Sequence, residues 1–276
     1  MGSLGSHLYI PADSDRRVSS ASRIAADSFI LDLEDGVAEN QKALALSTLA
    51  QTVQKLDKKD VWVRINTGDH GLEDLEKVLA IGGLTGVWIP KAEPGATFDR
   101  MRKLAESADL ELGVLIESGS GYVGRQELLR HTSVTRVQIG EYDLRGDLGM
   151  AENVPATEPD LHPIRLEIVV SAISNDVSSI VAGVSSNFTD LPEYERSSLR
   201  MRNIGFNGRA VIHPAQVEVC QRVFYPTEHE IHQATQIVDQ FAEQSLNGIG
   251  AYRDKDGNMA DAATVRRAQW ILNQIS

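Results

Sequence analysis

Short apolar runs recur at regular intervals along the chain and suggest buried strands. They are near-continuous in Val, Ile and Leu and do not alternate with polar residues. Parallel strands that are covered on both faces have this composition, because neither face meets water. The eight runs cover residues 7–12, 28–35, 61–66, 86–92, 112–118, 134–143, 178–186 and 208–214.

Amphipathic segments separate these runs. Each places apolar residues at spacings of i, i+3, i+4 and i+7, which is typical of a helix with one buried stripe. They cover residues 14–26, 39–56, 72–80, 96–108, 121–131, 163–175, 193–204 and 214–224. Eight repeats of strand then helix predict an α/β fold, a (β/α)8 TIM barrel, over residues 7–225. A doubly wound open sheet is the alternative. The barrel is favoured because eight strands suit closure and no Gly-x-Gly-x-x-Gly motif follows a strand.

The pattern changes after residue 224. A long helix is predicted to begin near Thr227 and to reach about Leu246, with Thr227 as N-cap and Glu230 at the capping-box position. A polar, glycine-rich loop follows at 248–261, and a final helix closes the chain. Because no strand is evident, residues 226–276 are predicted to be a C-terminal helical extension. It would pack on the barrel exterior, form a contact in an oligomer, or act as a lid on the active site.

Composition and charge narrow the class of protein. Lys and Arg total 27 and Asp and Glu total 39, which gives a net charge of −12, and hydrophobic residues make up 42%. These values fit a folded globular protein without the basic footprint of nucleic-acid binding. No stretch of about 18 apolar residues exists, so no membrane span is expected. The single cysteine, Cys220, favours a reducing compartment, and we expect a cytoplasmic protein.

Charged residues follow most of the predicted strands. In a barrel the carboxyl ends of the strands meet on one rim, where active sites form. Carboxylates gathered there would repel one another, and a divalent cation such as Mg²⁺ would relieve the repulsion. Arg64 and Lys91 at the same level would recognise an anionic substrate. The charged and polar strand-end residues are Asp13, Asp32, Glu34, Asp35, Arg64, Lys91, Glu93, Glu117, Glu141, Asp143 and His213.

A series of motifs in register resembles a known family. The chain resembles the citrate lyase beta-subunit-like family of the HpcH/HpaI aldolase superfamily, which includes malyl-CoA and citramalyl-CoA lyases. The motifs are LYIPADSDRR, FILDLEDGV, VRIN, WIPKAE, LIES, EYDLRGDLGM, GFNGRAVIHPAQV, FYP and GNMADAATVRRAQWIL. The resemblance implies a (β/α)8 barrel that uses Mg²⁺, with Mn²⁺ as an alternative, to cleave or form a C–C bond between an acyl-CoA thioester and a 2-oxo acid. It also implies a homo-oligomer, either a trimer or a hexamer.

The same resemblance implies roles for individual residues. Glu117 of LIES and Asp143 of EYDL match the two metal ligands, and Asp147 is the less suitable ligand. Arg64 matches the arginine that binds the substrate carboxylate and steadies the enolate oxygen, although a salt bridge to Glu34 or Asp35 is an alternative role. Glu34 and Asp35 match an acidic pair near the metal-bound waters.

Other residues keep two interpretations. Asp261 precedes a helix and is a natural N-cap; the resemblance instead implies an acid or base that reaches the active site of a neighbouring subunit. Arg16 and Arg17, with Lys42, are the basic candidates for binding CoA, and ordinary solvated charge is the alternative. Lys91 and Glu93 are interpreted as a structural ion pair.

Departures from the family pattern affect the substrate more than the metal. PADSDR replaces a Pro-Gly turn, LIES is followed by GSG, and EYDL replaces the common Gly-x-x-Asp-Leu form. The particular thioester and 2-oxo acid therefore stay open among citryl-, malyl- and citramalyl-CoA. The alternatives are a metal-dependent aldolase on free 2-oxo acids, a beta subunit that acts on a carrier-protein thioester, and a non-catalytic barrel.

Overall fold

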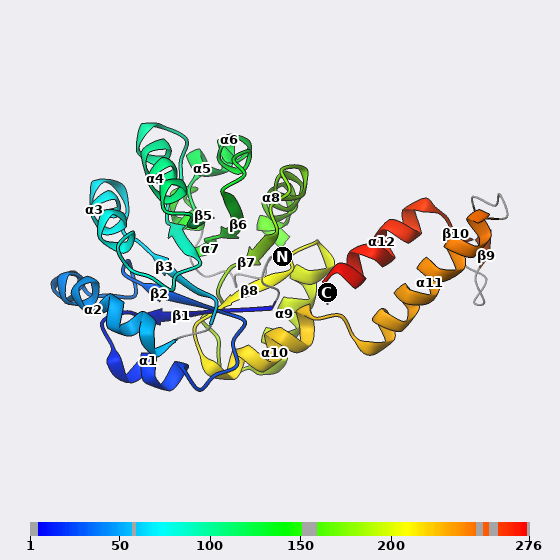
Figure 1. Ribbon diagram of the computed structural model, residues 1–276, viewed down its shortest axis with the longest axis horizontal. Coiled ribbons are helices and arrows are strands. Elements are labelled where there is room, and N and C mark those ends of the chain that lie inside the picture. The colour runs from blue at the N-terminus through cyan, green and yellow to red at the C-terminus, as the bar shows by residue number, and fades with distance from the viewer. Residues whose placement is uncertain (1–4, 57–58, 151–158, 247–250, 254–258, 275–276) are drawn as a thin grey trace. The chain divides into compact units, whose positions relative to one another are not determined.

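The structure is a computed structural model that describes residues 5–56, 59–150, 159–246, 251–253 and 259–274. The chain divides into two compact units, Met1–Phe224 and Tyr225–Ser276 (Figure 1). Among the described residues, no helix is both long enough and apolar enough to cross a bilayer.

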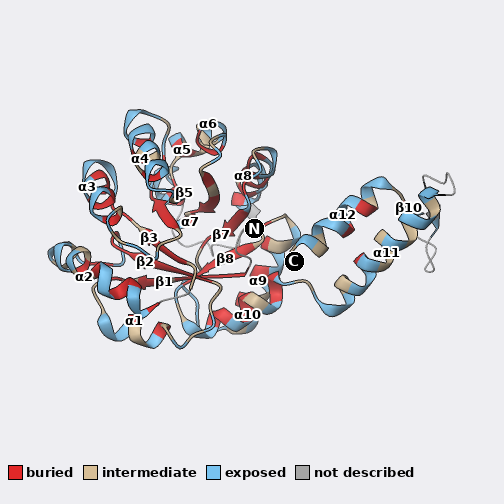
Figure 2. Ribbon diagram, viewed as in Figure 1, coloured by how far each residue is buried: buried red, intermediate tan, exposed pale blue. Residues whose placement is uncertain are grey.

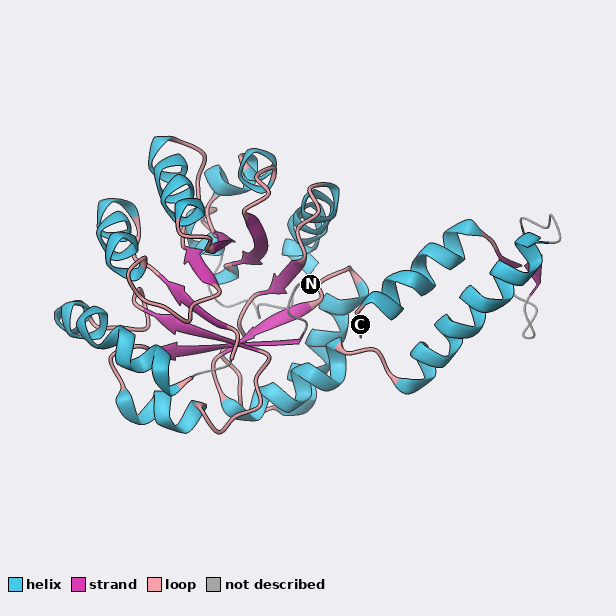
Figure 3. Cartoon of the chain, in the orientation of Figure 1, coloured by secondary structure: helices cyan, strands magenta, loops and turns pink. Residues whose placement is uncertain are grey.

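The first unit contains eight parallel strands that close into a barrel (Figure 3). Each strand pairs with the next along the chain, and β1 pairs with β8, so the barrel has no open edge. The strands are β1 (Gly5–Pro11), β2 (Ser28–Asp32), β3 (Val61–Arg64), β4 (Gly86–Ile89), β5 (Glu111–Ile116), β6 (Val134–Ile139), β7 (Ser179–Ala182) and β8 (Gly208–Val211). The prediction of a (β/α)8 barrel is confirmed, and the open doubly wound sheet is excluded.

Helices alternate with the strands and surround the barrel (Figure 1). They are α1 (Asp15–Ala21), η1 (Glu39–Gln41), α2 (Lys42–Lys55), α3 (Gly68–Val78), α4 (Ala96–Ser107), α5 (Gly119–Val123), α6 (Arg125–Leu129), α7 (Glu141–Asp147), η2 (Pro159–Leu161), α8 (His162–Ser174), α9 (Leu191–Asn203) and α10 (Pro214–Phe224).

The core has an inner and an outer layer. Successive strand side chains point to opposite faces, so Trp62 lies inside the barrel and Val63 packs in the layer between strands and helices. The inner cluster consists of Ile30, Trp62, Trp88, Leu115, Val181 and Ala210. Because both faces of each strand are buried (Figure 2), the runs are uniformly apolar in sequence. Truncation of a buried Trp here would cost about 3–5 kcal/mol.

Two segments differ from the predicted elements. The run 134–143 is one strand only to Ile139, because the chain then turns at Gly140 into α7. Glu141 and Asp143 lie in the first turn of α7, where carboxylates are favoured by the helix dipole. In place of the predicted helix 121–131 the chain forms two short helices, α5 and α6, which meet at Gly124. A Cβ there would lie 2.3 Å from the Pro94 Cγ atom, so only glycine fits this close approach.

The second unit contains α11 (Glu228–Leu246), a short antiparallel pair of β9 (Tyr252–Arg253) and β10 (Met259–Ala260), and α12 (Ala262–Asn273). The capping box predicted for α11 is present. The Glu230 backbone N–H donates to Thr227 Oγ1 at 3.2 Å, and the Thr227 N–H donates to Glu230 Oε2 at 2.8 Å. The strand pair was not predicted, because two-residue strands leave no periodicity. Residues 248–250 and 254–258 of the predicted loop lie outside the described residues.

Candidate active site

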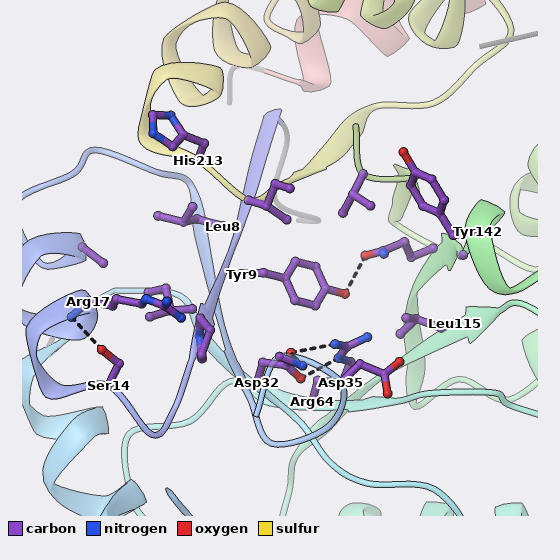
Figure 4. A pocket seen from close by; sticks show the side chains of 18 of the residues that line it. Leu8, Tyr9, Ser14, Arg17, Asp32, Asp35, Arg64, Leu115, Tyr142 and His213 are labelled. Atoms are coloured by element: carbon purple, nitrogen blue, oxygen red, sulfur yellow. Dashed lines mark hydrogen bonds and ion pairs between the residues drawn. The ribbon is translucent and has the colours of Figure 1, made fainter. Parts of the chain in front are cut away.

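A cavity of about 950 Å³ opens at the carboxyl ends of the strands. Its lining comes from β1, β2, β3, β5, β6 and α7, with α1 and the turn after β8 on one side. Figure 4 shows Tyr9, Asp32 and Arg64 close together in this cavity. Parallel strands of a barrel place their ends here, which is why residues distant in sequence meet.

Asp32 organises the turn after β2. Its Oδ1 atom accepts the Glu34 N–H at 3.0 Å, and Oδ2 accepts the Gly36 N–H at 2.9 Å. A Cβ at position 36 would lie 2.3 Å from Asp32 Oδ2, so glycine is required for this approach. Asp32 therefore fixes the loop that carries Glu34 and Asp35.

Arg64 is held by two buried carboxylates. Its Nε and Nη2 atoms donate to Asp32 Oδ1 and Oδ2 at 2.7 and 2.6 Å, and Nη1 lies 2.9 Å from Glu34 Oε2. The guanidinium carbon also lies 5.1 Å from the centre of the Tyr9 ring. Of the two partners expected from the sequence, Glu34 makes the salt bridge. The fork-shaped contact with Asp32 was not anticipated. Burial together with these acidic partners fixes the orientation of Arg64.

Glu117 follows β5 and is almost fully buried. Its Oε1 atom accepts the backbone N–H of Lys91 at 2.6 Å. Burial is the main cause that raises the pKa of Glu117 to about 7, and the carboxylates of Glu34 and Asp143 add to the shift. A Cβ at Gly140 would lie 2.3 Å from Glu117 Oε2, so the glycine leaves room for the carboxylate.

Asp143 lines the same cavity from the first turn of α7. Its side chain is 44% exposed, and its Oδ1 atom lies 3.8 Å from Lys91 Nζ. By contrast, Asp147 accepts the Gly119 N–H at 2.7 Å and is not among the residues that line the cavity. We call Asp32, Glu34, Asp35, Glu117 and Asp143 the acidic rim.

Glu117 and Asp143 fit a divalent cation. No group of three or more His, Cys, Asp or Glu side chains arranged for a metal occurs among the described residues. Mg²⁺ does not need one, because it prefers one or two carboxylates with water and substrate oxygens in its other positions. The raised pKa of Glu117 reflects buried negative charge that a cation would compensate.

The predicted pair of Lys91 and Glu93 does not form. Lys91 Nζ lies 3.0 Å from Glu34 Oε1 and 3.7 Å from Asp35 Oδ2, while Glu93 accepts the Ser118 hydroxyl at 2.7 Å. The reason is the turn after β4, which directs the lysine toward the acidic rim.

The basic candidates for CoA binding separate in space. Arg16 and Arg17, on α1, line the cavity. Lys42 does not line it. Its Nζ atom donates to Asn66 Oδ1 at 2.6 Å and lies 3.2 Å from Glu39.

Sequence reasoning missed the floor of the cavity. Tyr9 lies in the middle of β1, and its hydroxyl donates to Gln138 Oε1 on β6 at 2.9 Å. Strand alternation in the run at 7–12 would have placed Tyr9 inside the barrel. It could not have shown the partner, which lies 129 residues away.

His213 also lines the cavity. Its ring stacks on Phe188 with centroids 4.7 Å apart, and its Nδ1 accepts the Ala215 N–H at 3.1 Å.

Asp261 is the N-cap of α12 in the second unit. It accepts the backbone N–H groups of Ala263 and Thr264 at 3.0 and 2.9 Å. These hydrogen bonds, led by that from Thr264, lower the pKa of Asp261. The capping interpretation therefore describes its local geometry, and a catalytic role stays a prediction.

The fold and the cavity define an enzyme of the (β/α)8 barrel class with an acidic, arginine-containing site. Residues 6–214 match the HpcH/HpaI aldolase/citrate lyase family. The chain belongs to this family, and it is a carbon–carbon lyase. The family resemblance seen in the sequence motifs is thereby confirmed.

Relatives and solved structures agree with this assignment. A (3S)-malyl-CoA thioesterase of Cereibacter sphaeroides is 32% identical over 249 residues, 88% of this chain and 85% of the relative. The mitochondrial citramalyl-CoA lyase of Rattus norvegicus is 29% identical, covering 96% of this chain and 84% of the relative. The structure of CitE from Mycobacterium tuberculosis with magnesium, acetoacetate and coenzyme A matches with a TM-score of 0.80 and 26% identity. That match covers 99% of this chain and 98% of the other.

Proposed function

We propose that this enzyme cleaves or forms a 3-hydroxyacyl-CoA that is a 2-hydroxy acid at its free carboxylate end, such as malyl-CoA or citramalyl-CoA, in a Mg²⁺-dependent reaction. The products of cleavage are an acyl-CoA and a 2-oxo acid. One observation carries the proposal: Glu117, Asp143 and Arg64 come from different segments of the barrel and line one cavity. The citramalyl-CoA lyase relative and the CitE complex with magnesium and coenzyme A support it.

Glu117 and Asp143 would hold the cation. A bound Mg²⁺ would supply a Lewis acid that favours loss of the substrate hydroxyl proton and polarises the carbonyl. Glu34 and Asp35 stand beside these ligands and would accept hydrogen bonds from the waters around the ion. Burial raises the pKa of Glu34, with the Arg64 charge acting against the shift.

Arg64 would bind the substrate carboxylate and face the enolate oxygen. Breaking the C–C bond leaves its electron pair on the thioester fragment, and a fixed cation stabilises that charge as it develops. Asp32 and Glu34 hold the guanidinium in place before substrate arrives, so little reorganisation is needed. The enolate carbon then takes a proton and gives the acyl-CoA.

The proton donor and the CoA site complete the proposal. Asp261 from a neighbouring subunit of a trimer or hexamer would exchange the proton at the enolate carbon. Arg16 and Arg17 are the better placed CoA candidates because they line the cavity, and their charge suits the CoA phosphates. Lys42 is a weaker candidate, since its ammonium is already bound by Asn66 and Glu39.

Thioester hydrolysis is a second candidate activity beside C–C bond cleavage. It is favoured by the first relatives, four (3S)-malyl-CoA thioesterases at 30–32% identity. Water would attack the thioester carbonyl and release CoA with the free hydroxy acid, leaving the C–C bond intact. A citrate lyase beta subunit, acting on a carrier-protein thioester, shares the lyase chemistry.

The test compares products with citryl-, malyl- and citramalyl-CoA in the presence of Mg²⁺. Lyase activity gives a 2-oxo acid without a free thiol, whereas hydrolysis gives a free thiol without a 2-oxo acid. We expect 2-oxo acid release that falls about 100-fold or more in Glu117→Ala and Asp143→Ala, because each removes a metal ligand. Glu73→Ala, on an exposed face of α3, is the matched control. Unchanged turnover in the two ligand variants would refute the metal assignment.

A further inference from the structure

Lys91 contacts the acidic rim and has an unusual backbone conformation. It follows β4, and its φ of 45° lies in the left-handed region that residues with a Cβ avoid. Such a conformation persists only where the surroundings hold it, and it often occurs at functional sites. The contacts of Lys91 therefore need a physical explanation.

The turn brings the backbone of Lys91 to a proposed metal ligand. The Lys91 N–H donates to Glu117 Oε1 at 2.6 Å, and the next N–H, from Ala92, donates to Leu115 O at 3.1 Å. These two bonds tie the turn after β4 to the end of β5. One oxygen of Glu117 is thereby fixed, and the carboxylate is oriented without any charge being neutralised.

The side chain of Lys91 contacts three other carboxylates of the acidic rim. Its ammonium lies 3.0 Å from Glu34, 3.7 Å from Asp35 and 3.8 Å from Asp143. These three carboxylates come from the turn after β2 and from α7, so the lysine links two segments that no strand pairing joins. The Lys91 side chain is 40% exposed, so a cation or water can reach its contact with Asp143.

The carboxylates of the acidic rim outnumber the cations that contact them, and this makes the contact between Lys91 and Asp143 important. The acidic rim has five carboxylates, and within the described residues the cations that contact it are Arg64 and Lys91. Arg64 is engaged by Asp32 and Glu34. Lys91 is therefore the cation that faces Asp143, at the place where the proposed Mg²⁺ would bind.

We propose that Lys91 is a positioning residue that serves as a tethered counter-ion. It keeps Glu34, Asp35 and Asp143 close together when no divalent cation is present, and its charge opposes the cation that enters. The proposal rests on the metal site described under Proposed function. It assigns to Lys91 the setting of Mg²⁺ affinity, separate from the chemistry of bond cleavage.

Calorimetric titration of the whole protein with Mg²⁺ alone tests this proposal. Lys91→Met removes the charge and keeps the backbone N–H. It is expected to bind Mg²⁺ about five-fold more tightly or better, because a repelling charge within a few ångströms is gone. The Mg²⁺-dependent rise in melting temperature should also be larger in this variant. Lys91→Arg keeps the charge and should stay within about two-fold of the wild type. Lys103→Met, on the exposed face of α4, is the control for loss of one lysine.

Lys91→Gly separates charge from backbone strain. Glycine accepts the left-handed conformation, so this variant keeps the turn even if Lys91→Met does not fold. It should bind Mg²⁺ as tightly as Lys91→Met. Suppose that the wild type binds Mg²⁺ while folded Lys91→Met and Lys91→Gly bind it equally or more weakly. That result would overturn the role of Lys91 and leave the metal site standing. Absence of Mg²⁺ binding by the wild type would remove the metal site itself, and this proposal with it.

Discussion

Glu141 and Asp143 lie two positions apart in the first turn of α7, and their surroundings give them different tasks. Glu141 is 5% exposed, and its two oxygens accept from Arg165 Nε and Nη2 at 2.8 and 2.6 Å. Asp143 is open to the cavity. A carboxylate that is fully engaged by a buried arginine holds α7 against α8, whereas its exposed neighbour can exchange partners.

Replacing Arg165 with Met should destabilise the barrel strongly. The substitution leaves Glu141 as a buried charge without its arginine, at a cost of about 3–5 kcal/mol in the free energy of unfolding. Urea denaturation measures the loss. The double variant Arg165→Met, Glu141→Leu removes both charges and should recover most of the stability. A double variant as unstable as the single one would show that packing by Arg165, and not its charge, is what matters.

Cys220 should be inert in the native protein. It is fully buried, its thiol donates to Gly5 O at 3.2 Å, and burial raises its pKa to about 12. Because the thiolate is the reactive form, alkylation by iodoacetamide at pH 8 should be roughly 100-fold slower in the native than in the denatured protein, as followed by mass spectrometry.

The raised pKa of Cys220 also determines how the stability of the protein changes with pH. The folded thiol keeps its proton while the unfolded thiol ionises above about pH 9, so its contribution makes stability fall as the pH rises from about 9 to 12. Rapid alkylation of the folded protein at pH 8 would contradict this account.

At the scale of elements, the spacing of apolar residues predicts the strands and helices of the barrel. This is because the spacing depends on whether an element is buried on one face or on both. The carboxyl ends of the strands are less predictable. Glu34 and Asp35 were assigned to a strand, yet β2 ends at Asp32 and the acids lie in the turn that Asp32 organises.

The sequence likewise predicts only part of the candidate active site. Strand order places Arg64, Glu117 and Asp143 on one rim, and the sequence was sufficient to bring them together. The contacts of Lys91 depend on the conformation of one turn, and the pair of Tyr9 and Gln138 depends on side chains that meet across the barrel. Neither leaves a periodic signal in the chain.

Two substitutions of Asp261 can separate its role as the N-cap of α12 from its proposed role in proton exchange. Asparagine caps a helix about as well as aspartate, so Asp261→Asn should leave the melting temperature nearly unchanged, while Asp261→Ala should lower it because the cap is lost. If Asp261 exchanges the substrate proton, both variants lose turnover. Thermal unfolding and lyase assays on the two variants provide the measurements. Full activity in Asp261→Asn would leave the residue with capping alone.

At the scale of the whole molecule, the two units differ in how much core they contain. The barrel is filled by the inner and outer apolar clusters. In the second unit the buried residues among those described are Ala234, Ala260, Val265 and Ala268, and Leu246, Met259 and Trp270 are exposed. So few buried side chains do not offset the entropy of ordering two helices.

A chain that ends at Tyr225 should therefore keep the folded barrel, while the isolated segment 226–276 should be largely unfolded. Circular dichroism and urea denaturation test each part. The truncated barrel should still bind Mg²⁺, since Glu117 and Asp143 remain. It should lose lyase turnover if Asp261 is the proton donor. Cooperative unfolding of the isolated segment would show that it has a core of its own.

Gly36 and Gly140 impose a limit on how this enzyme can diversify. Neither has the left-handed φ that would by itself require glycine, yet a methyl group at either position would lie 2.3 Å from an oxygen of Asp32 or Glu117. In a randomised library selected for turnover, these two positions should remain invariant even where the fold tolerates alanine. Selection that keeps these carboxylates must therefore also keep the glycines beside them. A lineage that replaces either glycine is expected to lose the reaction before it loses the barrel fold.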